Sequence, residues 1–203
     1  MPRVTPILRK ARKALQDLDL LKVLQSEITH ELSSTPFQNS LSGSLGEFSV
    51  EWDSPQSQDV VLRRKCESGE EVAVSALLGP VTNVKEGVFP RDVLMKVCLK
   101  KPGMSSMLQF DCGVFDRGDE GSEFDIHNAY YIPSSSRVDP SDYRGPLFST
   151  LDPQLQDALK KYLVAKGVGE SLTNFLILHL HKKEQGQYVN WLQKLESSVA
   201  KSE

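Results

Sequence analysis

The N-terminal segment carries apolar residues at alternating spacings of four and three, with Gln25 as one polar member of the series. This is the a/d pattern of a coiled coil, and it predicts a helix of 29 residues from Val4 to Leu32. Such a helix would be about 43 Å long, so it must bury its seam against another long helix or another chain. The seam consists of Ile7, Ala11, Ala14, Leu18, Leu21, Gln25, Ile28 and Leu32.

Between residues 47 and 132 the periodicity changes to two, which indicates strands. Short turns such as 67–70 and 101–103 separate the strands, and parallel strands would need crossovers of about a dozen residues or more. We therefore predict an antiparallel meander. The predicted strands are 47–53, 59–66, 71–78, 92–100, 107–115 and 123–132.

The last third of the chain returns to helical spacing. Asp152 is a predicted N-cap with Pro153 at the first helical position, and Gly167 is the predicted stop. A final helix is predicted over 170–199, and we expect it to pack against the first helix in coiled-coil fashion. The order of helix, strands and two helices predicts the α+β class. The residues predicted to form the coiled coil and an oligomer contact are Leu18, Leu21, Ile28, Leu32, Tyr188, Trp191, Leu192 and Leu195.

Composition indicates an ordinary globular chain. With 203 residues and 39% apolar residues it can build a core, and its longest apolar runs are far shorter than the ~20 residues of a membrane span. Three cysteines without a CxxC pair, and the lack of an Asn-x-Ser/Thr sequon, favour a reducing compartment.

The charge is divided unequally along the chain. Residues 1–16 carry +5 with no acid, which leaves 19 bases against 27 acids, or −8, for residues 17–203. We predict two parts, a basic leader or remnant of a mitochondrial targeting segment at 1–16 and a single acidic domain at 17–203. The alternative for 1–16 is a basic first turn of the helix. The acidic body argues against direct binding of nucleic acid and for basic proteins as partners.

The sequence carries no recognisable catalytic, cofactor or metal site. Its four histidines are scattered, and His179 and His181 diverge on a helix because they are two residues apart. No nucleophile elbow, phosphate-binding loop or dinucleotide pattern occurs. We therefore expect a protein without enzymatic activity and without a cofactor.

Acidic residues concentrate between positions 111 and 125, where six acids face one arginine for a charge of −5. The spacing departs from that of an EF-hand, and chance is the preferred explanation of the tripeptide Arg117-Gly118-Asp119 in a chain with intracellular features. Two interpretations stay open, a solvated hairpin tip or a face that attracts a basic partner. The candidate partner face consists of Asp116, Asp119, Glu120, Glu123 and Asp125.

Three helical segments carry a resemblance to a known family. Residues 159–168 with their Gly167 stop, residues 175–195 with their Tyr188-Val189-Asn190-Trp191-Leu192 run, and residues 20–32 resemble the helices of the mitochondrial glycoprotein family. The Glu-Leu-Ser-Ser-Thr-Pro ending of the first helix is most similar to plant members.

The resemblance implies a twisted antiparallel sheet of about seven strands, flanked by one N-terminal and two C-terminal helices, in a ring-shaped homotrimer. It also implies a chaperone-like adaptor of the mitochondrial matrix that binds basic proteins such as mitochondrial ribosomal proteins. Ribosome assembly, translation and oxidative phosphorylation are the processes implied. The alternatives are an adaptor in the cytosol, nucleus or plastid, or an enzyme with an unrecognised site.

Overall fold

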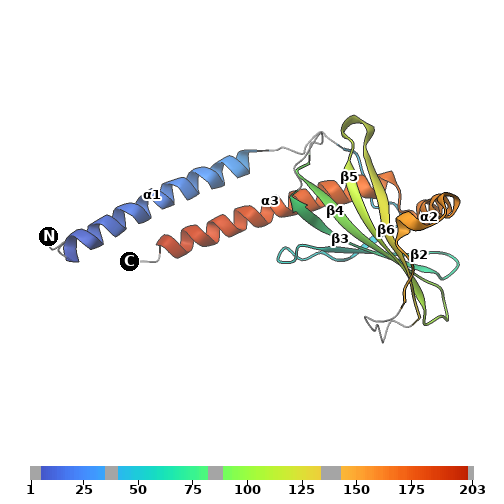
Figure 1. The fold of residues 1–203 in the computed structure, drawn as a ribbon. Helices are drawn as coiled ribbons and strands as arrows, with labels where there is room; N and C mark the ends of the chain where they lie inside the picture. The colour runs from blue at the N-terminus through green and yellow to red at the C-terminus, as the bar shows by residue number, and fades with distance from the viewer. Residues whose placement is uncertain (1–5, 35–40, 82–88, 134–142, 201–203) are drawn as a thin grey trace. The chain divides into compact units, whose positions relative to one another are not determined.

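The computed structural model describes residues 6–34, 41–81, 89–133 and 143–200, with the backbone alone for 6–14 and 119. The chain forms two compact units, which we call the helical unit (residues 1–38 and 184–203) and the sheet unit (residues 39–183). The elements, labelled in Figure 1, are α1 (Pro6–Ser33), β1 (Ser49–Trp52), β2 (Val60–Lys65), β3 (Glu71–Val81), β4 (Arg91–Lys100), β5 (Met107–Asp116), β6 (Ser122–Ile132), α2 (Pro153–Ala165) and α3 (Glu170–Ala200), with short 3-10 turns η1 (Gly118–Glu120) and η2 (Phe148–Thr150).

The sheet is an antiparallel meander in the order β1-β2-β3-β4-β5-β6, as the short turns predict. Alternate residues of each central strand point inward, and α2 and residues 170–183 of α3 cover that face (Figure 1). The core between sheet and helices is built from aliphatic and aromatic side chains that are almost fully buried, including Leu62, Val74, Val97, Phe110, Leu163 and Leu176.

The strand count differs from the expectation of about seven, because the described residues form six strands. Residues 143–147 lie along the β6 edge, joined to it by a bridge between Asn128 and Leu147 and by a hydrogen bond from the Tyr131 N–H to the Arg144 carbonyl, 3.2 Å, and in the described part of the chain they form no further strand. Gly145 has φ +135° and Pro146 lacks an N–H, so regular pairing is interrupted here.

The predicted boundaries of α2 are confirmed. The Asp152 carboxylate accepts a hydrogen bond from the Gln154 N–H at 2.9 Å, and Pro153 occupies the first turn. At the other end Gly167 has φ +89°, and the Val168 N–H donates to the Leu163 carbonyl at 3.1 Å. A Cβ on Gly167 would lie 2.6 Å from a guanidinium nitrogen of Arg64, a flexible side-chain end that can move, so the positive φ is the main reason for glycine here.

In the helical unit, α1 packs against residues 184–200 of α3 through part of the predicted seam. Leu21 and Ile28 of the seam are half-buried, and among the side chains described for α1 the buried one is Leu24, next to the seam position Gln25. Leu18 and Leu32 are exposed by 53% and 66%. The inward stripe includes Asp17, Leu21, Leu24, Ile28 and Glu31, so it keeps the spacing of four and three but is rotated by one residue at three of its five positions.

The residues of α3 that were predicted to join the coiled coil also differ in burial. Leu192 is buried and Leu195 half-buried, as predicted, whereas Trp191 is 53% exposed. Tyr188 stacks on Trp191 with ring centroids 5.9 Å apart, and its hydroxyl donates to a Glu27 carboxylate oxygen at 3.2 Å. Within a single chain, Trp191 is therefore not a core residue. Among the described residues, no helix combines the length and apolar character that a membrane span requires.

Candidate functional site

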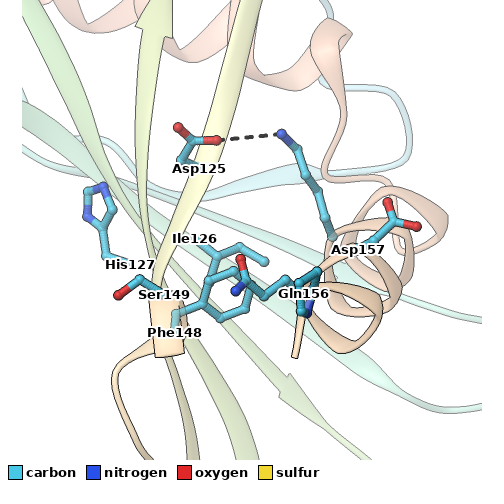
Figure 2. A pocket seen from close by; sticks show the side chains of 9 residues that line it. Asp125, Ile126, His127, Phe148, Ser149, Gln156 and Asp157 are labelled. Carbon is cyan, nitrogen blue, oxygen red and sulfur yellow. Dashed lines mark ion pairs between the residues drawn. The ribbon is translucent and has the colours of Figure 1, made fainter. Parts of the chain in front are cut away.

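A groove of about 730 Å³ lies in the sheet unit between β6 and α2, and we call it the β6–α2 groove (Figure 2). Its buried floor is formed by Ile126 and Phe148, and polar side chains stand around them. The lining residues are Asp125, Ile126, His127, Phe148, Ser149, Pro153, Gln156, Asp157 and Lys160.

Local structure explains how these side chains come together. β6 is an edge strand, and the Asn128–Leu147 bridge places η2, with Phe148, next to it. The Asp152 cap then starts α2, and the spacing of 156, 157 and 160 brings three polar side chains of this helix to the groove. Gln156 lies near Phe148, whereas the Asp157 carboxylate points outward from the helix (Figure 2).

Lys160 crosses from α2 to β6 and pairs with two carboxylates. Its ammonium group donates to Glu123 Oε1 at 2.7 Å and lies 3.6 Å from Asp125 Oδ1. The same nitrogen lies 5.5 Å above the Phe124 ring. The hydrogen bond from Lys160, with the nearby charge of Arg117, lowers the pKa of Glu123 below its ordinary value.

The structure separates the five residues of the predicted acidic face. Glu123 lies in β6, within the strand predicted over 123–132 and outside the hairpin tip, and Arg117 and Lys160 both pair with it. Asp125 follows on the same strand and reaches the groove. Asp116 is the last residue of β5 and accepts a hydrogen bond from the Gly118 N–H at 3.0 Å. Glu120 is exposed in η1, and the side chain of Asp119 lies outside the described residues.

Two carboxylates of the groove remain accessible. Asp125 and Asp157 keep 61% and 60% of their side-chain surface exposed, although Lys160 and Lys161 respectively pair with them. Exposed ion pairs of this kind are worth about 0–1 kcal/mol, so cations from a partner can replace the internal lysines. The groove can therefore hold a lysine or arginine, with the stem on the apolar floor and the charged head at a carboxylate.

Three of the four histidines lie in or near the core of the sheet unit or line its groove. His127 and Ser149 both line the groove, but no hydrogen bond joins them in the part of the chain that the structure describes. His179 is bonded to the Asp53 carboxylate at 2.8 Å, and His181 packs against Phe89 in the core. Within the described ranges, no three His, Cys, Asp or Glu side chains gather as a metal site would require.

Sequence reasoning found Asp125 but missed the other walls of the groove. In the sequence, Asp157 and Lys160 belong only to the polar face of a predicted helix. Phe148 lies between the predicted strands and that helix, and no periodic pattern surrounds it. A polar 3-4 spacing on α2 was the available signal, but its partner strand lies more than thirty residues earlier.

The family model of the mitochondrial glycoprotein (MAM33) matches residues 90–199, more than half of the chain. The chain belongs to the mitochondrial glycoprotein family. A relative, the mitochondrial acidic protein mam33 of Schizosaccharomyces pombe, is 31% identical over 125 residues, which cover 54% of this chain and 44% of that protein. The chain thus spans less than half the length of that relative.

A plant relative extends the match. An uncharacterized mitochondrial protein of Arabidopsis thaliana is 27% identical over 191 residues, covering 87% of this chain and 72% of that protein. Both relatives are mitochondrial by name, and the second agrees with the similarity of the first helix to plant members.

Two solved structures share the fold. The p22 protein of Trypanosoma brucei has a TM-score of 0.71 at 20% identity, covering 91% of this chain and 99% of that one. A Leishmania major protein of unknown function, described as a homologue of human p32, has a TM-score of 0.67 at 17% identity with the same coverage. At these identities the likeness concerns the fold alone.

Proposed function

We propose that this protein is a non-enzymatic acidic adaptor of the mitochondrial matrix that binds basic proteins and acts as a chaperone-like homotrimer. Mitochondrial ribosomal proteins are the expected clients, so its work would support ribosome assembly, translation and oxidative phosphorylation. Membership of the mitochondrial glycoprotein family and the mitochondrial names of its relatives support this proposal.

The observation that carries the binding role is the β6–α2 groove, where exposed carboxylates stand above an apolar floor. A basic segment gains charge-assisted hydrogen bonds at Asp125 and Asp157 and apolar contact with Phe148. The remaining acidic body attracts such segments over longer distances, more strongly at low ionic strength.

The test compares two double variants that change the net charge equally. Asp125→Asn with Asp157→Asn removes the groove carboxylates, whereas Glu67→Gln with Asp92→Asn removes exposed acids elsewhere in the sheet unit. We expect the groove variant to weaken binding of a Lys/Arg-rich peptide about 5- to 30-fold at low salt, and the control about twofold or less. Equal weakening would contradict a role for the groove and leave only a diffuse acidic attraction.

Clients and compartment need separate experiments. Affinity purification from isolated mitochondria should yield basic proteins that elute as salt rises, because screening weakens exposed charge contacts. Imaging of tagged chains with and without residues 1–16 should show mitochondrial import that depends on the leader. Import into another organelle, or none, would favour the adaptor outside mitochondria.

The homotrimer is supported by apolar surface that a single chain leaves exposed in the helical unit. Leu18 and Leu32 on α1, and Trp191 on α3, have more than half of their surface in contact with water. Sedimentation at micromolar concentration should give three times the mass of the chain. Trp191→Ala should shift this toward monomer, whereas Leu155→Ala, which removes an exposed leucine of α2, should not. A monomeric wild-type chain would contradict the trimer.

A further inference from the structure

A second cavity, of about 200 Å³, lies beneath α2 at the end of the sheet where β4 is connected to β5. The acidic turn between β5 and β6 lies at the opposite end of β5. Leu99, Leu108 and Tyr131 are in register across β4, β5 and β6 and form one wall. Tyr162 of α2 forms another, and Met104 and Met107 lie at the β4–β5 connection. Its walls are thus largely apolar and aromatic, unlike those of the β6–α2 groove.

Two side chains that can donate hydrogen bonds line this cavity, and in the described part of the chain no hydrogen bond from either of them is formed. Ser106 lines it and is only 8% exposed, yet over the residues described its hydroxyl makes no hydrogen bond. Lys101 lines it too, and in the same described part it makes no ion pair. The Ser106 oxygen is not sealed from solvent, so a ligand in the cavity can take the place of water as its hydrogen-bond partner.

The charge around the cavity decides what kind of ligand fits. The Glu70 carboxylate is already satisfied, because Lys166 pairs with it and the Tyr162 hydroxyl donates to it at 3.2 Å. The charge of Lys101 also acts on Glu70, so two lysines face one carboxylate, and the net positive charge that is left attracts an anionic ligand and repels a cationic one.

We propose that this cavity binds a small monocarboxylic acid with a short apolar tail. Lys101 and Ser106 donate to the carboxylate, and the tail packs against Leu108, Met107 and Tyr131. The volume of about 200 Å³ is small and suits a short acid of about six carbons. This binding does not depend on the adaptor function.

The four methionines provide a direct readout. In protein labelled with ¹³C at the methionine methyl groups, sodium hexanoate should shift the signals of Met104 and Met107 and leave that of Met95, which is buried in the core, unchanged. Hexanamide, a neutral molecule of the same length, should produce the same shifts only at about tenfold higher concentration. If hexanoate shifts neither signal, or hexanamide binds equally well, the proposal is overturned.

Matched variants test the two polar groups. Lys101→Gln should raise the Kd for hexanoate about five- to tenfold, and Ser106→Ala about threefold. Lys100→Gln makes the same charge change on the preceding residue, which is exposed and does not line the cavity. This variant should leave the Kd within about twofold. Equal effects of Lys101→Gln and Lys100→Gln would refute the assignment, and the Met95 signal reports whether each variant is folded.

Discussion

Replacing Glu70 by glutamine should destabilise the sheet unit, because this carboxylate connects the β2–β3 turn to the end of α2. Its side chain is 7% exposed, and it accepts hydrogen bonds from Lys166 and from the Tyr162 hydroxyl. The substitution keeps an oxygen for Tyr162 but leaves the Lys166 ammonium without its counter-charge.

The size of the effect follows from the burial of the two partners. Removing one partner of a fully buried pair costs about 3–5 kcal/mol, whereas a fully exposed pair is worth about 0–1 kcal/mol. Lys166 keeps 23% of its side-chain surface exposed, so water recovers part of the loss. We expect Glu70→Gln to lower the free energy of unfolding by about 2–3 kcal/mol.

A double-mutant cycle with Lys166→Met isolates the interaction. Urea unfolding of wild type, both single variants and the double variant should give a coupling energy of about 1–2 kcal/mol, because the double variant leaves neither charge unpaired. A coupling energy indistinguishable from zero would refute the reasoning, since the two groups would then contribute independently.

The pH dependence provides a second check. The hydrogen bond from Lys166 lowers the pKa of Glu70 below its ordinary 4.5, and the bond to Glu70 raises the pKa of Lys166 above its ordinary 10.5. The Glu70 contribution is therefore complete above pH 4.5 and is lost as pH falls through the lowered pKa. The Lys166 contribution is complete below pH 10.5 and is lost as pH rises through the raised pKa. The stability difference between wild type and Glu70→Gln should be constant from about pH 5 to 10 and shrink on both sides.

Three further predictions concern local structure. In urea unfolding, Gly167→Ala should lower the free energy of unfolding by about 1–3 kcal/mol, because Gly167 has a positive φ. Gly186→Ala should raise it by about 0.5–1 kcal/mol, because a Cβ at this helical position meets nothing within 4 Å. Effects of equal sign would contradict this. Asp152→Ala should cost about 0.5–2 kcal/mol in the same assay, and no change would mean that the cap contributes nothing. Burial raises the pKa of the Cys112 thiol to about 12, so in the native protein at pH 8 iodoacetamide should modify the half-buried Cys66 well before Cys112, as peptide mass mapping would show.

The extent of most elements could be predicted from the sequence. The cap at Asp152, the stop at Gly167 and the period-two segments determine where α2 and the six strands lie, because these signals depend on backbone geometry within a few residues. The same holds for the antiparallel order, since the short turns allow no crossover. The expected seventh strand came from the resemblance, and Gly145 and Pro146 interrupt the edge where residues 143–147 run beside β6.

Tertiary structure alone decided which side chains meet. The heptad series could not reveal that Leu24 packs inward while Leu18 stays exposed, because both stripes satisfy the helical period and only the partner helix selects one. Likewise, Glu123 meets Lys160 and Glu70 meets Lys166 across separations of 37 and 96 residues. The sequence by itself thus determined the elements, their order and the acidic character of the body. The groove, the cavity and the paired state of the acids arise only when the sheet and helices pack, since each is formed by residues that no local pattern connects.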